Sequence, residues 1–401
     1  MDGQLIKATH LLTLPTNFLS VTSISLFTSN NFKGKSIPLN ISKRNLNTLN
    51  LIKNGHCLQQ KNSKLNFSFG AVANRNFESH GPKVQPIQNI NSSILELTRL
   101  NNNFNPEIHK VVPFYLDTVN IGVIPENVFI QLKKYNKTFK RRLRPFSITS
   151  RRVTFSEYID TYEKKSQVME DLLIYWRDND TFDCLKGWRN EVYPIFDANH
   201  EIAFRIERSG IALFGFRAYG CHINGYVEDS KTHQLKMWIA QRSFKKQTFP
   251  GKLDNIVAGG VSFPFNPTET AIKECLEEAS IPNEISTQIV PCGAVTYISV
   301  EKRGISTDSQ YVFDLKLPDS YQPKPLDNEV EGFYLMDFKE IIERLKNNEF
   351  KVNSGIVIID FMIRHGILTH TMEENYLEIL SNIHRPIPFP GPNFINMRHK
   401  K

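Results

Sequence analysis

The first regular pattern of apolar and polar positions begins at about Ile108 in this 401-residue chain. Apolar periodicity and turn residues define the elements that follow. In order, they are an apolar stretch over 111–123, a short helix over Pro125–Leu132, a longer helix over Thr154–Arg177, and antiparallel strands over Trp188–Ile211 that turn at Asp197–His200. Together they predict a small α+β domain.

A second set of patterns occupies the C-terminal half. Gly220–Val227 and Met237–Arg242 are typical of paired strands joined by a polar hairpin loop. Two further strands are expected over Ile289–Val300 and Gln310–Lys316, separated by the loop Glu301–Ser309. Three helices follow, over Phe338–Asn347, Ile356–His365 and Met372–Ile383. From Pro386 we expect an extended or disordered proline-rich tail.

Between these strands, a glycine-rich loop leads into one helix, over 251–281. Asn266 is suited to cap this helix, Pro267 to its first turn, and Glu269 to close a capping box, together worth about 1 kcal/mol. Helical spacing predicts one buried stripe, made of Ala271, Ile272, Cys275, Leu276 and Ala279.

Three carboxylates, Glu274, Glu277 and Glu278, stand at i, i+3 and i+4, so we expect them to converge on the opposite, open face of this helix. Close carboxylates repel one another, and a hard divalent cation relieves that repulsion. Oxygen ligands favour Mg²⁺ or Mn²⁺, which bridges to a diphosphate. The alternative is an acidic helix face that is simply solvated.

Gly259 and the run Lys273–Ile281 resemble the Nudix box at its correct spacing. Three positions depart from that pattern: Phe265 stands in place of the first Glu, Lys273 in place of Arg, and Ser280 in place of a helix-ending Gly. Lysine keeps the charge but loses two-pronged hydrogen bonding. Serine must either adopt a left-handed conformation or end the helix differently.

Other segments resemble the Nudix branch related to thiamine pyrophosphokinase, which includes plant organellar members. They are 182–191, with its Trp188-Arg189-Asn190-Glu191, then 214–226, 238–243 and 249–255. The resemblance implies an α+β fold, with a Nudix α/β/α sandwich on a mixed sheet behind a small α+β domain. It implies four regions: a leader over 1–104, an upstream domain over 105–213, a hydrolase domain over 214–370, and a helix and tail over 371–401.

The resemblance also implies a site. Glu274, Glu277 and Glu278 would hold Mg²⁺ or Mn²⁺ and serve in catalysis, with Lys273 steadying them or a phosphate oxygen. Glu329, or less well Glu331, would bring one more acid to the metal, and the general base stays open between Glu329 and the box carboxylates. Substrate contacts are expected from four residues: Arg242, Lys252, Gly259 and Gly260.

The expected reaction is hydrolysis of thiamine diphosphate, or of its oxidised analogues, to the monophosphate and phosphate. The alternative substrate is an oxidised guanine nucleotide of the 8-oxo-dGDP or 8-oxo-dGTP type. A binding module that has lost catalysis is a further alternative, supported by Phe265 and Ser280. The partner is therefore expected to be a small-molecule diphosphate, and a homodimer is possible for this family.

The net charge excludes few classes of function, but the distribution of charged residues shows where the basic excess lies. The net charge is +8, and residues 1–77 carry all of that surplus. The rest of the chain is balanced, which argues against a nucleic-acid partner. A basic run over 133–152 with interleaved aromatic residues leaves RNA contact open, although a solvated helix face explains it better.

The acid-poor leader suits a mitochondrial transit peptide, although its scarce arginine weakens that interpretation, and a cytoplasmic enzyme with a disordered extension is the alternative. No apolar run is long enough for a membrane span, so no membrane partner is expected. The five scattered cysteines, Cys57 among them, predict free thiols without a disulfide or zinc site.

Overall fold

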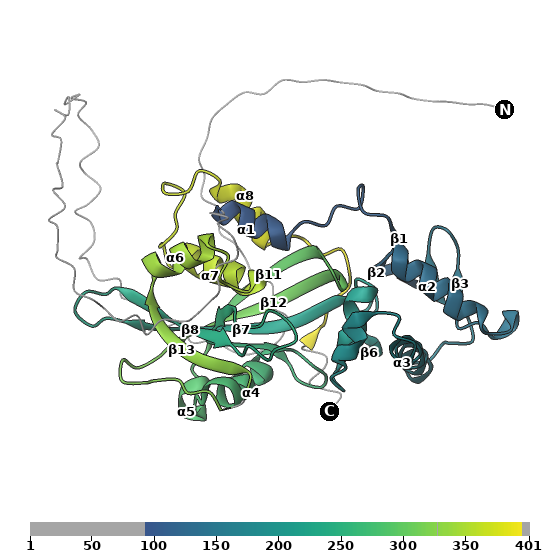
Figure 1. Ribbon diagram of the computed structural model, residues 1–401, viewed down its shortest axis with the longest axis horizontal. Helices are drawn as coiled ribbons and strands as arrows, with labels where there is room; N and C mark the ends of the chain where they lie inside the picture. The colour runs from purple at the N-terminus through teal and green to yellow at the C-terminus, as the bar shows by residue number, and fades with distance from the viewer. Residues whose placement is uncertain (1–92, 327, 395–401) are drawn as a thin grey trace, which may run out of the picture. The chain divides into compact units, whose positions relative to one another are not determined.

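A mixed sheet forms the centre of the C-terminal half in the computed structural model, which describes residues 93–326 and 328–394 (Figure 1). Its strand order is β11-β12-β7-β8-β13, with β10 paired to β7 and β9 to β8. The strands are β7 (Arg217–Glu228), β8 (Leu235–Arg242), β9 (Leu253–Asn255), β10 (Val257–Gly260), β11 (Val290–Glu301), β12 (Gly304–Lys316) and β13 (Val330–Asp337). β12 runs parallel to β7 and the other pairs are antiparallel, which confirms the mixed sheet.

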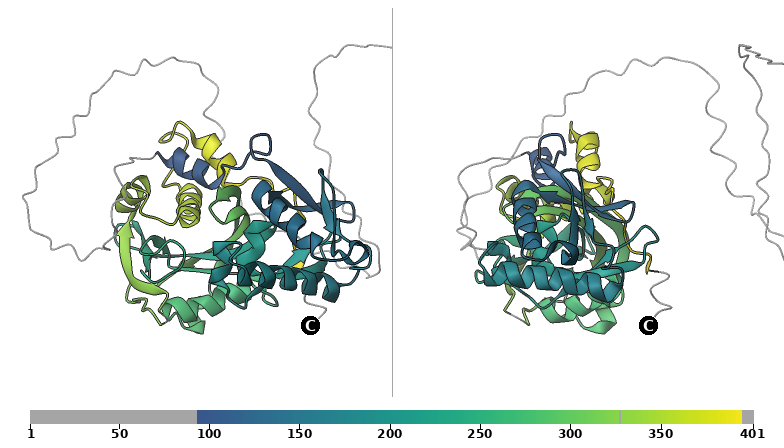
Figure 2. Two further views of the ribbon diagram at one scale, coloured as in Figure 1. Left: turned by 45° about the vertical axis from the view of Figure 1, so that its right-hand side comes forward. Right: turned by 90° about the vertical axis from the view of Figure 1, so that its right-hand side faces the viewer.

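Helices cover both faces of this sheet, as the sandwich prediction requires (Figures 1 and 2). On one face lie α4 (Pro267–Ala279) and the short α5 (Asn283–Ser286). The other face carries α6 (Phe338–Lys346), α7 (Val352–Arg364) and α8 (Tyr376–Ile383). The three closing helices are therefore confirmed, although α8 begins four residues later than expected.

The last part of the expected leader is folded. Residues Ile94–Asn101 form helix α1, which opens with a capping box of Ser93 and Glu96 and packs against α7 and α8. Ile94, Leu95 and Leu97 are buried in the same apolar cluster as α6 and α7. This burial explains why the helix is ordered beside an asparagine-rich sequence. The predictions for residues 1–92, including Cys57, fall outside the described residues.

The region upstream of the large sheet is α+β, as predicted. It contains a four-stranded sheet of order β2-β1-β4-β3 and a separate hairpin of β5 and β6. Its elements are β1 (Val111–Leu116), β2 (Val119–Pro125), α2 (Glu126–Lys137), β3 (Phe146–Ile148), β4 (Val153–Phe155), α3 (Tyr162–Asp178), β5 (Val192–Phe196) and β6 (Ile202–Glu207). The hairpin turns where the sequence predicted.

Two predicted boundaries were wrong. Helix α3 begins at Tyr162, not at Thr154, because Thr161 caps it by accepting from the Lys164 amide, and Val153–Phe155 instead pairs with β3. The expected loop Glu301–Ser309 is a tight hairpin, because β12 already begins at Gly304 and pairs with β11. The polar residues 306–310 are thus strand residues, and this change proves important for the site.

The C-terminal segment is packed as far as the structure describes it. The backbone amide of Arg385 donates to the Thr296 carbonyl, and the Tyr219 hydroxyl donates to the Pro390 carbonyl. Between them, Phe389 is buried. Of the two predicted alternatives, an extended or a disordered tail, the extended one agrees with this segment as far as the structure describes it. The four described cysteines are free thiols, as predicted. Within the described residues, no helix combines the length and apolarity that a membrane crossing demands.

Candidate active site

The carboxylate-bearing helix α4 starts and ends as its sequence predicts. The Asn266 side chain accepts from the Glu269 amide, the Glu269 carboxylate accepts from the Asn266 amide, and Pro267 occupies the first turn. Ser280 ends the helix in the left-handed conformation, at φ 54°, and its hydroxyl donates to the Lys324 carbonyl. Serine therefore takes over the position that glycine usually fills.

The orientation of α4 differs from the prediction. Leu276, expected in the buried stripe, is 46% exposed, whereas Glu278, expected on the open face, is only 8% exposed. Ala271, Cys275 and Ala279 pack against the sheet as expected. The helix is thus rotated so that Glu278 is buried against the sheet, where its carboxylate accepts a hydrogen bond from the Ala258 amide of β10.

The three carboxylates experience very different surroundings. Glu278 accepts a hydrogen bond from the Ala258 amide (3.0 Å), and burial, together with the charge of Glu274, raises its pKa to about 8. Burial also raises the pKa of Glu274. Glu277 is exposed and forms an ion pair with Lys273 at 2.6 Å, and the same ammonium lies 3.7 Å from Glu274.

These residues suit a hard divalent cation. The pKa values of the buried Glu278 and the partly buried Glu274 are raised, which shows that too little positive charge surrounds these carboxylates. Their oxygen atoms are ligands that Mg²⁺ or Mn²⁺ prefers. Among the described residues, no group of three or more Asp, Glu, His or Cys side chains is arranged so that it could already hold a metal ion. Instead, the Lys273 ammonium lies between the carboxylates of Glu274 and Glu277.

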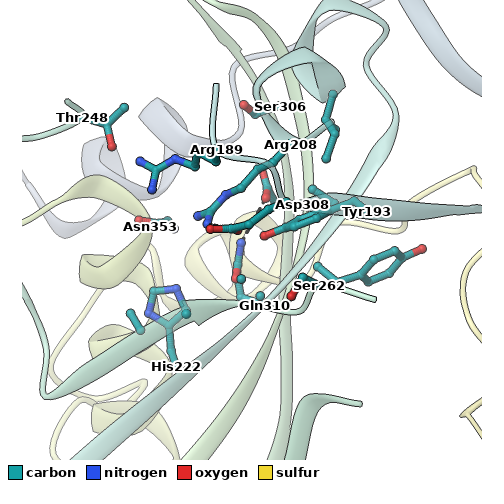
Figure 3. A pocket seen from close by; sticks show the side chains of 18 of the residues that line it. Arg189, Tyr193, Arg208, His222, Thr248, Ser262, Ser306, Asp308, Gln310 and Asn353 are labelled. Carbon is teal, nitrogen blue, oxygen red and sulfur yellow. Dashed lines mark hydrogen bonds and ion pairs between the residues drawn. The ribbon is translucent and has the colours of Figure 1, made fainter. Parts of the chain in front are cut away.

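The box glutamates open into a cavity of about 430 Å³ (Figure 3). Strands of the large sheet, α4 and the upstream hairpin all contribute to its walls. From the upstream region come Arg189, Glu191, Tyr193 and Arg208, and Arg208 pairs with Glu191 at 2.8 Å. The cavity therefore combines residues from both halves of the described chain.

Gly259 and Gly260 both line this cavity, and a side chain on either would displace a neighbouring side chain. A Cβ on Gly259 would stand 2.5 Å from Cγ of Glu274, and one on Gly260 would overlap the Tyr193 hydroxyl. Their absent side chains make room for a carboxylate and a phenol that face the cavity.

Glu329 also lies in the cavity wall. Its carboxylate forms an ion pair with Lys246, and, against the effect of burial, the charges of Lys246 and Arg189 lower its pKa. The structure thus brings Glu329 and the three box glutamates into one site. Glu331 does not line this cavity.

The two predicted basic substrate contacts are placed differently. Arg242 lines the cavity, but its guanidinium pairs with Asp254 at 2.9 Å and donates to the carbonyls of Thr248 and Phe249. Lys252 is not among the lining residues, because its ammonium donates to the Asn348 carbonyl behind the sheet. The sequence places Lys252 close to the carboxylate-bearing helix α4, but it does not show in which direction the lysine side chain points.

Sequence reasoning missed three polar residues that also line the cavity. Asp308 and Gln310 lie on β12, and the Gln310 amide donates to Asp308 at 3.0 Å. Burial raises the pKa of Asp308 to about 6. Asn353, from α7, contributes a buried amide oxygen that accepts no hydrogen bond from any described residue. The mistaken loop over Glu301–Ser309 concealed Asp308, whereas Gln310 began a predicted strand and Asn353 lay outside every predicted element.

His222 is a further lining residue that the sequence did not single out. Its Nδ1 lies 2.8 Å from Oδ1 of Asn255, whose amide in turn donates to Asn224. Burial and the nearby Lys351 charge lower the pKa of His222 to about 4, so the ring is neutral at pH 7. Since Nδ1 donates to Asn255, Nε2 keeps its lone pair for an acceptor role.

Comparisons with known proteins agree with this architecture. Residues 222–354 match the family described as NUDIX domain, and residues 93–218 match a domain of unknown function, DUF4743. An uncharacterized protein of Saccharomyces cerevisiae is 39% identical over 58% of this chain and 72% of its own length. Nudix hydrolase 20, chloroplastic, of Arabidopsis thaliana is 30% identical over 70% of this chain and 75% of its own length.

Solved structures are more distant. A crystal structure from Deinococcus radiodurans is 20% identical and covers 40% of this chain and 91% of its own, with a TM-score of 0.30. The curated relatives, which extend over both domains, carry the assignment. This chain belongs to the Nudix hydrolase family, enzymes that act on diphosphate bonds.

Proposed function

We propose that the cavity hydrolyses a terminal diphosphate, with Glu274, Glu277 and Glu278 as the residues that would hold Mg²⁺ or Mn²⁺. When bound, such a cation neutralises diphosphate charge and makes water a better nucleophile. The observation that carries this proposal is a buried carboxylate, Glu278, with the partly buried Glu274 and the exposed Glu277 beside it in a cavity rich in cationic side chains.

Other residues of the cavity fit supporting roles. Lys273 keeps Glu277 close to Glu274, and its ammonium is available to a phosphate oxygen once Glu277 turns inward. Glu329 is a candidate general base, because its carboxylate lines the cavity together with the box glutamates and is ionised near neutral pH. Arg242 acts indirectly, by fixing the carbonyls of the 248–249 loop beside the cavity.

For the organic group we propose the aminopyrimidine of thiamine diphosphate or of its oxidised analogues. Asp308, Gln310 and Asn353 offer carboxylate and amide groups that match the nitrogen-bearing edge of such a ring. The buried Asn353 oxygen would receive a donor from the substrate, which offsets the cost of its burial. Phe265, which also lines the cavity, provides an apolar contact where the family pattern has a glutamate.

An oxidised guanine nucleotide is the second candidate, because the same carboxylate and amides can pair with the edge of guanine. The test is hydrolysis in Mg²⁺, followed as phosphate released from thiamine diphosphate, its oxidised analogues and 8-oxo-dGDP, and as AMP released from ADP-ribose and NADH. We expect release from the thiamine compounds and its collapse in Glu277→Gln. Preference for 8-oxo-dGDP would keep the mechanism and replace the substrate, while bound ligand without any release would favour the binding-module alternative.

We also propose an organellar enzyme made of a leader, the upstream domain over 105–213, the hydrolase domain over 214–370, and a C-terminal segment. Mitochondrial import would be tested by imaging the full chain and a chain lacking residues 1–77, each fused to a fluorescent protein. Retention of both in the cytoplasm would overturn the proposed location. Sedimentation would test the homodimer, and salt-sensitive RNA binding would revive the role of the basic run over 133–152.

A further inference from the structure

Arg189 differs from the other cationic side chains around the cavity. Six others line it, and each has a carboxylate within 4.0 Å. The pairs are Arg208 with Glu191, Arg242 and Lys351 with Asp254, Lys246 with Glu329, Lys273 with Glu277, and Arg303 with Glu301. Among the described lining residues, only the guanidinium of Arg189 has no carboxylate at that distance.

The backbone of Arg189 is nevertheless held firmly. Its amide donates to the buried Glu207 carboxylate at 3.1 Å, and the same carboxylate oxygen accepts from the Ser209 amide. Beside it, the Arg208 amide donates to the Glu191 carbonyl at 2.8 Å. Hydrogen bonds around the start of β5 and the end of β6 therefore fix the backbone of Arg189, and its side chain remains available to bind a ligand.

The position of Arg189 suits a phosphate group. It faces the same cavity as the box glutamates, and its charge helps to lower the pKa of Glu329 after the larger effects of burial, which opposes it, and Lys246. It also borders a second, larger cavity that meets the first at Arg189, Arg208 and Arg303. Figure 3 shows Arg189 and Arg208 together on this wall.

We propose that Arg189 binds the terminal phosphate of the substrate, so that the upstream domain selects substrates whose diphosphate ends in a free phosphate. A terminal phosphate carries about −1.5 to −2 charges at pH 7 and three acceptor oxygens, which a guanidinium fork matches in a two-pronged contact. A diphosphate esterified at both ends, as in ADP-ribose, lacks that dianion. This inference rests on the proposed diphosphatase function and deepens it.

The test compares Arg189→Gln, Arg189→Lys and the control Lys186→Gln. Lys186 is an exposed cation three residues away that pairs with Asp183 and Asp180, so its loss reproduces the change in net charge. For thiamine diphosphate we expect kcat/KM to fall about 10- to 100-fold in Arg189→Gln, mostly through KM, and less in Arg189→Lys. For ADP-ribose the fall should stay within about threefold, and Lys186→Gln should resemble wild type.

Equal losses for the two kinds of substrate, or no loss in Arg189→Gln, would overturn the inference. A binding experiment separates it from the proposed function. Calorimetric titration with methylenediphosphonate, which cannot be hydrolysed, should show about tenfold weaker binding to Arg189→Gln than to wild type in Mg²⁺. If wild type releases no phosphate from any compound but this difference persists, the hydrolysis proposal fails and the Arg189 site stands. Unchanged binding, with active wild type, would overturn the Arg189 site and leave the hydrolysis proposal standing.

Discussion

The side chain of Glu274 occupies the space that a side chain on Gly259 would need, with Cγ and Cδ of Glu274 2.5 and 2.6 Å from the position of a Cβ there. Gly259 pairs with Cys221 in the ladder between β10 and β7, so its backbone cannot easily retreat. The glycine of the Nudix box therefore sets the location of a carboxylate fifteen residues later in the sequence.

Gly259→Ala should displace Glu274 and lower kcat/KM by about tenfold to a hundredfold, because misplacing a reacting group by about 1 Å has effects of that size. Gly332→Ala on β13 is the matched control, since a Cβ there would meet nothing closer than 3.6 Å. Steady-state kinetics and thermal melting of both variants would check this. Full activity of Gly259→Ala would show that Glu274 can move without consequence.

Glu277→Gln should reduce turnover by roughly a hundredfold or more while leaving stability almost unchanged. Glu277 is exposed, and its ion pair with Lys273 contributes only about 0.3–0.5 kcal/mol to folding. Glu284→Gln, an exposed glutamate on the neighbouring α5, should behave as wild type. A parallel loss of activity and melting temperature in Glu277→Gln would instead mean that the residue is structural.

Glu278 should link divalent-cation binding to pH. Its folded pKa of about 8 lies above the unfolded value, so without a cation its contribution to stability is complete below pH 4.5 and is lost as pH rises through 8. Glu278→Gln should therefore stabilise the cation-free protein at pH 9, by on the order of 1–3 kcal/mol. The rise in melting temperature with Mg²⁺ should be larger at pH 8 than at pH 6 and disappear in the variant. A rise that is independent of pH would place the cation elsewhere.

The buried carboxyl group of Asp308 should destabilise the folded protein at neutral and higher pH. Burial raises its folded pKa to about 6, so the stability it contributes below pH 3.8 is lost as pH rises through 6. Compared with wild type, Asp308→Asn should gain about 1–2 kcal/mol more at pH 8 than at pH 4.5, measured by urea unfolding. Its kcat/KM for thiamine diphosphate should fall if Asp308 contacts the ring. An equal gain at both pH values would rule out the titration of Asp308 as the cause.

Ser280→Gly should stabilise the end of α4 without altering catalysis. The left-handed conformation at φ 54° costs a serine about 1 kcal/mol relative to glycine, although the variant also loses the hydrogen bond to the Lys324 carbonyl. We expect the melting temperature to rise by about 1–3 °C, with kcat unchanged. A change in kcat would mean that the departure from the family pattern tunes the site.

The sequence alone determined the start of α4, its length and the spacing of its three glutamates, because caps, proline and helical periodicity act over a few residues. It also determined the pairing of β7 with β8 and the α+β character of both domains. The sequence did not determine the rotation of α4. Leu276 is exposed and Glu278 is buried, the opposite of what their polarity predicts, and a backbone amide of β10 donates to the buried carboxylate.

Tertiary structure alone decided which distant residues share the cavity. Asp308 lies on a strand that the sequence suggested was a loop, and Lys252 turns away to Asn348 despite its place beside the metal helix. Arg189, from the upstream region, lines the same cavity as the box glutamates, and its backbone amide donates to Glu207. Sequence patterns report short-range geometry, whereas these neighbours depend on how strands pair and domains pack, and on the electrostatic cost of burying each charge.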